Sequence, residues 1–263
     1  MRIVVAVKQV AALDEEFELL VDGRSVDPDY LEWDLNEWDT FSLEAALQLR
    51  DALDGDGHEV VAVTIGEEEA QEGLLACLAK GADRAVRVWD ESLRDSDVLA
   101  VARVLAAVIE RESPDLVLCG VQSSDAVNGA TGVALSGFLG LAHVAVVKHI
   151  ELDGTTVTVQ RELEGGLVEI LTLPLPALLT IQTGINEPRY ATLRAIKQAR
   201  EKPLESLSLG ELGLDHGAVA AAAGSRVVSI AHPERGEGAQ MLEGAPAEVA
   251  ARIVEIVRDR MTG

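Results

Sequence analysis

The sequence is poor in aromatic residues and in basic residues, and each shortage restricts what the chain is able to do. Aromatics make up only 3% of the 263 residues although 48% are hydrophobic, so the core must consist mainly of Val, Leu, Ala and Ile. Such a mixture favours a parallel sheet covered by helices on both faces. The chain has 22 basic and 45 acidic residues, which give a net charge of −23. Binding to nucleic acid or to an anionic membrane requires a basic surface, so neither is expected as a partner.

Cysteine and long apolar runs are also scarce. Cys77 and Cys119 lie in the apolar runs LLACLAK and DLVLCG, which predicts buried, reduced thiols. No stretch approaches the roughly 18 apolar residues of a membrane span. The stretch MRIVVAVKQV indicates a first strand rather than a signal peptide, because Lys8 and an acidic run from Asp14 follow it. We therefore expect a cytoplasmic protein without stable membrane insertion.

Strand and helix patterns alternate over the first half of the chain. The expected strands are 2–7, 59–65, 85–89 and 115–119, and the expected helices are 40–53, 67–80, 96–111 and 131–139. This alternation predicts an α/β fold with a doubly wound, mostly parallel, Rossmann-like sheet. Residues 13–32 are acidic and are expected to be irregular, with a turn at Asp22-Gly23.

The pattern changes in the second half of the chain. Strands at 143–152 and 155–163 flank Asp153-Gly154, a strong hairpin signal, and further strands at 168–173 and 177–182 complete an antiparallel section. A short basic helix (191–200), a poorly packed arm (201–224) and a final amphipathic helix (246–261) are expected to follow. We therefore predict an α/β domain over 1–190 and an extension over 191–263 that lies against a partner subunit.

Several catalytic patterns are absent from the sequence. It has no P-loop, no HExxH, no GxSxG elbow and no GxGxxG after the first strand. None of its histidines forms a ligand-like pair with a cysteine or a carboxylate; these are His58, His143, His149, His216 and His232. We therefore predict no catalytic residue and no metal site.

The loop Gly120–Gly132 is the strongest candidate for a binding site. It follows the strand DLVLC and precedes a helix, and ligands of open α/β sheets bind beyond the carboxyl ends of strands. The N–H groups and partial positive charge of a helix N-terminus suit a phosphate, to which Asn128 and Thr131 could donate. A plain loop in which Ser123, Asp125 or Asn128 caps the helix fits the same residues, and spacing alone leaves both interpretations open.

Two neighbouring strand ends are expected to open on the same edge of the sheet. The backbone of Ala6–Gln9 and of Thr64–Gly66 could hold an adenine and a ribose there. The stretch 33–39, which contains Trp33 and Trp38, precedes a helix and could close the pocket, although ordinary buried packing of either Trp fits as well.

Four segments resemble the electron transfer flavoprotein beta family in the same order along the chain. They are VAVKQV at 5–10, DLNEWDTFSLEAAL at 34–47, LAKGADRAVRV at 78–88 and the loop at 120–132. The block 161–205 resembles the family's signature region, and INEPRYATLRAI within it is highly specific. VAVKQVAALDEEFE, DLNEWD and GVQSSD are most similar to methylotroph-type members, which serve trimethylamine dehydrogenase and related enzymes. The resemblance covers nearly the whole chain and is loosest at its C-terminal end.

The resemblance implies an electron carrier rather than an enzyme with its own substrate. The beta subunit would pair with an alpha subunit that carries most contacts to one redox-active FAD, and would itself bind a structural AMP. The heterodimer would accept electrons from a flavin dehydrogenase. The implied AMP-binding residues are Ala6, Asn36, Ile65, Gly120, Val121, Gln122, Ser123, Ser124, Asp125, Ala126, Val127, Asn128, Gly129, Ala130 and Thr131.

The same resemblance implies a dehydrogenase-recognition loop at about residues 181–203. Leu193 would be its apolar anchor, with Arg189, Tyr190 and Arg194 beside it. Apolar burial would supply affinity, and the surrounding charges would guide the approach. The alternative is that Leu193 packs inside its own helix.

Three positions bear on the cofactors. Many relatives carry a basic residue where this chain has Val121, so backbone N–H groups would contribute more to phosphate binding. The positions nearest FAD would be Leu13, which could only fill space, and Trp38, which could line the flavin. Bifurcating relatives, which hold a second FAD, typically read DGDTAQVG in the loop, whereas DAVNGATG here resembles the AMP-binding class.

Two other functions remain as alternatives. A stand-alone ATP-binding regulatory or hydrolase protein would need a Mg²⁺ ligand near the phosphate loop, for which Asp125 is the best candidate. A bifurcating-type subunit would bind a second FAD. The chain expressed alone would be colourless as an AMP-binding carrier subunit, ATP-hydrolysing in the second case and yellow in the third.

Overall fold

The structure, a computed structural model, describes residues 1–13, 17–21, 23–94, 96–232, 238–239 and 241–262, apart from the side chains of residues 13, 220, 222 and 262. Its contacts divide the chain into a unit Met1–Ser229 and a unit Ile230–Gly263, each of which is described by itself. Among the described residues, no helix combines the length and the apolar character needed to cross a membrane.

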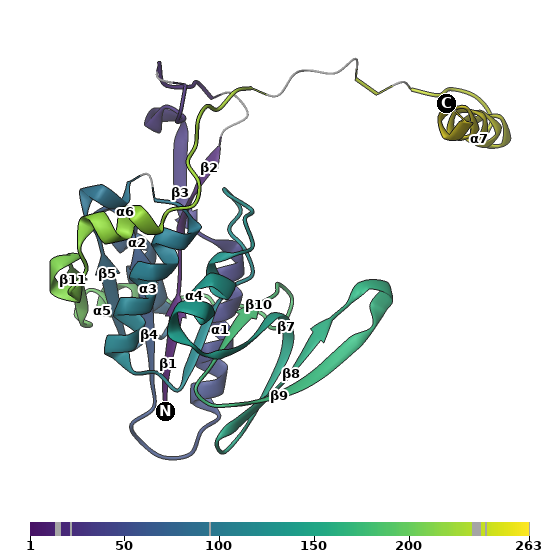
Figure 1. Cartoon of the computed structure of the whole chain (residues 1–263). Coiled ribbons are helices and arrows are strands. Elements are labelled where there is room, and N and C mark those ends of the chain that lie inside the picture. Colours follow the sequence, from purple (N-terminus) through teal and green to yellow (C-terminus); the bar gives the residue numbers. More distant parts are fainter. Residues whose placement is uncertain (14–16, 22, 95, 233–237, 240, 263) are drawn as a thin grey trace. The chain divides into compact units, whose positions relative to one another are not determined.

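The first unit is built on a large, mostly parallel sheet (Figure 1). Within the described residues its strand order is β11-β5-β4-β1-β6-β10-β7-β8-β9, and all neighbours from β11 to β7 run parallel, whereas β7–β8 and β8–β9 are antiparallel. The strands are β1 (Arg2–Ala6), β4 (Glu59–Ile65), β5 (Arg84–Val88), β6 (Leu116–Gly120), β7 (Ala142–Asp153), β8 (Thr156–Glu162), β9 (Val168–Pro174), β10 (Ala177–Ile181) and β11 (Leu204–Leu207). The predicted fold class, including the antiparallel section, is confirmed.

Helices cover both faces of this sheet. Helices α1, α2 and α5 pack on one face, and α3, α4 and α6 pack on the other. Their bounds are α1 (Glu37–Asp51), α2 (Ala70–Lys80), α3 (Val98–Glu112), α4 (Thr131–Leu139), α5 (Leu193–Ala199) and α6 (His216–Ala222), and α7 (Pro246–Thr262) forms the C-terminal helix in the second unit. Short 3₁₀ turns are η1 (Pro28–Tyr30), η2 (Glu91–Leu93), η3 (Glu164–Gly166) and η4 (Gly210–Leu212).

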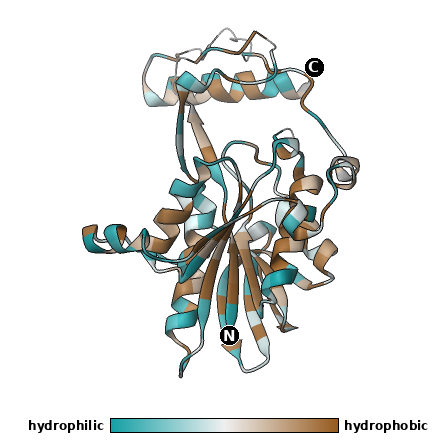
Figure 2. Ribbon diagram, turned by 90° about the vertical axis from the view of Figure 1, so that its left-hand side faces the viewer, coloured by the Kyte–Doolittle hydropathy of each residue, from teal (hydrophilic) through white to brown (hydrophobic). Residues whose placement is uncertain are grey.

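The core is the Val, Leu, Ala and Ile mixture that the composition predicts. Along β1, Ile3 and Val5 face the α1 side, whereas Val4 faces the α3 side, and all three are buried. Long hydrophobic stretches on the central strands are visible in Figure 2. Each fully buried side chain of this size contributes roughly 1.5–3 kcal/mol. Because the central strands are buried on both faces, their sequences lack an alternating polar pattern, as expected for a parallel sheet.

Residues 9–35 contain more structure than the sequence predicted. Strands β2 (Gln9–Leu13) and β3 (Leu31–Leu35) form an antiparallel ribbon, which Figure 1 shows extending from the sheet edge where β1 ends. Gly23 has a left-handed φ of 62° and fits the expected turn, while Asp22 lies outside the described residues. Helix α1 begins at Glu37 rather than at residue 40, which places Asn36 at its N-cap position.

The expectation of a poorly packed arm over 201–224 is wrong. Strand β11 pairs in parallel with β5, and Leu207, Leu209 and Val219 are buried in the core. The sequence LESL is short and half polar, so only its pairing with an open edge of the sheet makes it a strand. By these contacts the first compact unit extends to Ser229.

The point where the strand order reverses lies between β1 and β6. From β1 the chain builds β4 and β5 on one side and then crosses to β6 on the other, where Ala6 pairs with Cys119. The ribbon β2–β3 follows the end of β1, and the loop after Gly120 follows the end of β6. Ligands of doubly wound sheets bind at such a switch point, so the topology alone selects this edge as the candidate site.

Candidate functional site

The loop between β6 and α4 is exposed over residues 124–130 and reaches α4 without a side-chain cap. Val127 adopts a left-handed φ of 51°, and its N–H donates to the carbonyl of Ser123 at 2.9 Å. Ala130 stands at the N-cap position of α4, and no side-chain oxygen among the described residues caps the helix. The capped-loop interpretation is therefore not supported, and the first turn of α4 retains donors that suit an anion.

Asn36 joins the ribbon to this loop. Its side chain is only 1% exposed, its Nδ2 donates to the carbonyl of Gln122 at 2.9 Å, and its Oδ1 accepts from the N–H of Ser124 at 3.2 Å. Its own backbone N–H donates to the carbonyl of Lys8 at 2.9 Å. Both ends of the amide are thus used to fix the loop, and the structure brings Asn36 and residues 120–124 together as predicted.

Asp39, which the sequence analysis did not single out as a site residue, holds the two strand ends together. Its Oδ2 accepts from the N–H of Lys8 at 2.8 Å and its Oδ1 from the N–H of Gly120 at 2.9 Å. The side chain is 4% exposed, and burial raises the pKa of Asp39 to about 7, although the two N–H donors oppose the rise. A β-carbon on Gly120 would lie 2.5 Å from Oδ1 of Asp39 and 2.6 Å from the β-carbon of Trp38, so only glycine permits this approach.

Lys8, which sequence reasoning did not identify as a site residue, places its ammonium group at the loop. Its Nζ lies 2.7 Å from each carboxylate oxygen of Asp125 and 3.3 Å from Oγ of Ser123. Burial alone would raise the pKa of Asp125, but the bonds from Lys8 and Ser123 outweigh it and the pKa is lowered. The sequence signal that could have identified Lys8 is its position two residues after the end of β1, where a side chain at the switch point reaches the neighbouring loop.

The remaining predicted nucleotide residues lie on the same edge of the sheet. Ala6 is the last residue of β1 and Ile65 the last residue of β4, and the carbonyl of Val63 accepts from the N–H of Val7 at 2.8 Å. The N–H of Val121 is already bonded to the carbonyl of Ile181 at 3.2 Å, so it is committed to the sheet.

Of the two positions predicted to lie near a flavin, the structure describes the side chain of Trp38 but not that of Leu13. Trp38 packs against Gly120, and its Nε1 donates to Oε1 of Gln182 at 3.0 Å. Leu13 ends β2, and its side chain lies outside the described residues. Trp33, by contrast, is 53% exposed on the ribbon and is not packed in the core.

The predicted recognition segment presents apolar side chains to solvent. Leu193 is the first residue of α5 and is 82% exposed, and Tyr190 is 97% exposed, so Leu193 does not pack inside its own helix. Thr192 caps α5 by accepting from the N–H of Ala195 at 3.2 Å, and Arg194 is exposed. Arg189 differs from its neighbours because its guanidinium turns inward to Glu44 and Asp51 of α1.

The two thiols and the metal-type side chains form no further site. Cys77 and Cys119 are free and buried, and burial raises the pKa of the Cys77 thiol to about 12. Within the described ranges, no group of three His, Cys, Asp or Glu side chains is arranged to hold a metal ion.

Comparison with known proteins agrees with this arrangement. Residues 25–212 match the family model described as the electron transfer flavoprotein domain. The chain belongs to the electron transfer flavoprotein beta-subunit family. It is 48% identical to the electron transfer flavoprotein subunit beta of Methylophilus methylotrophus over 98% of each chain. It is also 32% identical to the Bacillus subtilis subunit over 93% of each chain, and 36% identical to the human subunit over 82% of this chain and 84% of the relative.

Membership of this family connects the fold with electron transfer by a flavoprotein. The matched region contains Asn36, Asp39 and the whole loop 120–131, and it extends through α5 and β11. It therefore includes the β6 side of the switch-point edge and the exposed segment around Leu193, whereas β1 and Lys8 precede it.

Proposed function

We propose that this chain is the beta subunit of a heterodimeric electron transfer flavoprotein. It binds AMP at the β1–β6 edge, helps to hold the FAD of an alpha subunit, and docks a flavin dehydrogenase through the segment around Leu193. It relays electrons and turns over no substrate of its own. The observation that carries the proposal is the loop after β6, which is exposed over residues 124–130, bonds to Lys8 through Asp125 and leads into α4 without a side-chain cap.

The residues at the switch point fit a nucleotide monophosphate. The first turn of α4 offers N–H donors together with the positive end of a helix dipole. Lys8 supplies the positive charge that the loop itself lacks at Val121. AMP would be held at its phosphate by the loop, by α4 and by Lys8, and at its adenosine part by the ends of β1 and β4. AMP carries no redox chemistry, so its contribution would be structural.

Exposed apolar surfaces support the presence of a partner subunit. The outer strand β9 exposes Val168 and Ile170, and in the second unit α7 exposes Ile253, Val254 and Val257. Apolar surface of this kind marks interaction sites in soluble proteins. The relatives carry the name subunit beta, which supports an alpha subunit as the partner. FAD would be bound mainly by that subunit, with Trp38 on the side of this chain.

The exposed segment around Leu193 suits a transient docking contact. A protruding leucine offers apolar area for a small pocket, and the neighbouring Arg194 and Lys197 offer charge that accelerates encounter. The stretches VAVKQVAALDEEFE, DLNEWD and GVQSSD, which resemble methylotroph-type members, favour an amine dehydrogenase of the trimethylamine dehydrogenase type as the electron donor. A small contact of this kind can dissociate quickly, as an electron shuttle requires.

Nucleotide analysis of the purified complex tests the proposal. The chain is co-expressed with the alpha subunit from the same organism, and the nucleotides released by acid precipitation are identified by chromatography. We expect a yellow heterodimer with AMP and FAD in equal amounts, and a colourless chain when it is expressed alone. Hydrolysis of ATP by the chain alone, or a second FAD in place of AMP, would show that one of the alternative functions is correct.

A further inference from the structure

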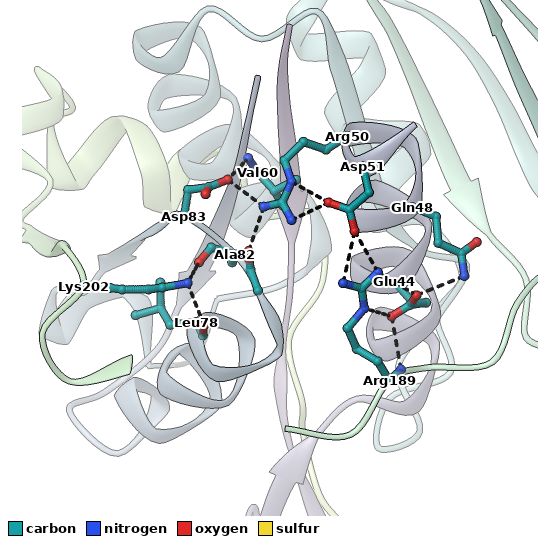
Figure 3. Close-up of polar contacts among 11 residues, drawn as sticks. Glu44, Gln48, Arg50, Asp51, Val60, Leu78, Ala82, Asp83, Arg189 and Lys202 are labelled. Carbon is teal, nitrogen blue, oxygen red and sulfur yellow. Dashed lines mark hydrogen bonds and ion pairs between the residues drawn. The ribbon is translucent and has the colours of Figure 1, made fainter. Parts of the chain in front are cut away.

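The docking segment, defined here as residues 190–200, is fastened to the body of the protein directly before its first residue. Asn186 donates from Nδ2 to the carbonyl of Phe41 at 3.0 Å. Arg189 then bonds to Glu44 through its backbone N–H at 3.1 Å, its Nε at 2.8 Å and its Nη2 at 3.1 Å, and both of its terminal nitrogens lie 3.2 Å from Oδ2 of Asp51 (Figure 3). One guanidinium therefore bridges two carboxylates on successive parts of α1.

The partner of Arg189 is a buried carboxylate. The side chain of Glu44 is 5% exposed, and its Oε1 also accepts from Nε2 of Gln48 at 3.0 Å. Burial would raise the pKa of Glu44, but the bonds from Arg189 outweigh it and the pKa is lowered. A buried charge is stable only when it is paired, so Glu44 strongly favours the conformation that keeps Arg189 in place.

A second fastening follows the segment. Nζ of Lys202 donates to the carbonyls of Leu78 and Ala82, at 3.0 and 2.6 Å, where α2 ends. A lysine at a helix C-terminus satisfies carbonyls that lack intrahelical partners. Arg50 connects the two fastenings. It bonds at 2.7 Å to Asp51, which also binds Arg189, and at 2.9 Å to Asp83, which follows the carbonyl that Lys202 binds. Figure 3 shows these contacts as adjoining parts of one polar region between α1 and α2.

The segment between the fastenings packs against α2 through α5 but buries few of its side chains. Within it only Ala199 is buried, while Tyr190, Leu193 and Ile196 are exposed. Helix α5 covers only Leu193–Ala199, which is far too short to be stable in isolation. The position of Leu193 therefore depends on the contacts at the two ends of the segment and on the packing of α5 against α2.

We infer that Arg189 and Lys202 are positioning residues, which hold the docking segment in its binding conformation rather than contact the dehydrogenase. The inference rests on the proposed docking role of Leu193. Ordering a loop before binding removes part of the entropic cost of association, so a fastened segment binds faster and more tightly than a loose one. Arg189 is unsuited to direct contact because its charge is already neutralised by two carboxylates.

Substitution of Glu44 separates positioning from contact, because this buried residue cannot touch another protein. Glu44→Ala removes the main partner of Arg189 and leaves Arg189 itself unchanged. Arg189→Lys keeps the charge but loses the multiple bonds, and it provides the same test if Glu44→Ala folds poorly. The matched control is Arg194→Ala, which removes an exposed charge from the segment without affecting the fastening.

Hydrogen exchange of the full chain, without any partner, gives the first measurement. We expect both fastening variants to raise amide exchange across residues 190–199 by roughly tenfold or more, and Arg194→Ala to leave it unchanged. Unchanged exchange in Glu44→Ala and in Arg189→Lys would overturn the inference. The exchange measurement is made without a dehydrogenase, so its outcome does not depend on whether the proposed docking role is correct.

The second measurement is the rate at which trimethylamine dehydrogenase reduces the heterodimer. Stopped-flow spectroscopy records this rate at several salt concentrations. We expect Glu44→Ala to slow reduction roughly tenfold with an unaltered salt dependence, whereas Arg194→Ala alters the salt dependence. A normal rate for Glu44→Ala together with a slow Arg189→Lys would show that Arg189 contacts the dehydrogenase directly. If Leu193→Ala also reacts normally, the docking role itself is wrong, whatever the exchange data show.

Discussion

Asp39 accepts a hydrogen bond from the N–H of Gly120 at 2.9 Å, so the first turn of α1 fixes the last residue of β6, directly before the loop that leads to α4. The other carboxylate oxygen accepts from the N–H of Lys8, which follows β1. One buried side chain thus sets the spacing of the two strand ends at the switch point. The arrangement depends on burial of a titratable group, which makes it open to a test by pH.

The pKa of Asp39, about 7 in the folded protein against 3.8 ordinarily, predicts a specific pH dependence of stability. Between these values the folded state binds more protons than the unfolded state, so the contribution of Asp39 is fully present below about pH 4 and is lost as the pH rises through about 7. The difference between the two pKa values corresponds to about 4 kcal/mol.

Asp39→Asn removes this titration, and it also places an N–H donor opposite a backbone N–H, which lowers stability at every pH. The advantage of the wild type over the variant should therefore shrink as the pH rises. Urea unfolding of both proteins at about pH 5 and about pH 8 measures this difference in the free energy of unfolding. An advantage that stays constant between the two pH values would mean that Asp39 is already ionised in the folded protein at about pH 5.

Gly120→Ala should destabilise the protein and release AMP. A β-carbon would lie 2.5 Å from Oδ1 of Asp39, so the loop backbone would have to move, at a cost of about 1–3 kcal/mol. Thermal unfolding and the AMP content of the purified heterodimer measure the two effects. Gly137→Ala is the matched control, because its β-carbon would meet no atom within 4 Å and would add helix propensity to α4. Equal behaviour of the two variants would contradict the close-approach argument.

The sequence predicted the loop 120–131 and its position at the sheet edge, because a hydrophobic run that ends before Lys8 defines β1 and one that ends at Gly120 defines β6. It also placed Asn36 beside the loop. The roles of Asp39 and Lys8 could not be predicted from local pattern, since both depend on which strands become neighbours. The same reason explains β11: the residues LESL form a strand only because β5 leaves an open edge for them.

Lys8→Met and Asp125→Asn should have opposite effects on AMP. If Nζ of Lys8 binds the phosphate, its loss should weaken AMP binding by about tenfold or more, since a charged hydrogen bond is worth about 1.5–3 kcal/mol. Asp125→Asn should leave binding unchanged or tighter, because it frees Lys8 from a competing carboxylate. Equilibrium dialysis of AMP against nucleotide-depleted heterodimer measures both. Weaker binding in Asp125→Asn would instead assign the carboxylate itself a role in the site.

Leu193→Ala should slow electron acceptance while AMP and FAD are retained. Leu193 is 82% exposed, so its loss leaves no cavity and should not change stability, whereas a dehydrogenase that buries it would lose a central contact. Truncation of such a contact costs about 1–2 kcal/mol, which predicts a rate of reduction about fivefold to thirtyfold lower at subsaturating dehydrogenase. The matched control is Leu99→Ala, since Leu99 is a partly exposed leucine on α3, across the sheet from α5. Equal rates for the two variants would remove Leu193 from the docking surface, and a loss of AMP in Leu193→Ala would mean that the segment supports the nucleotide site instead.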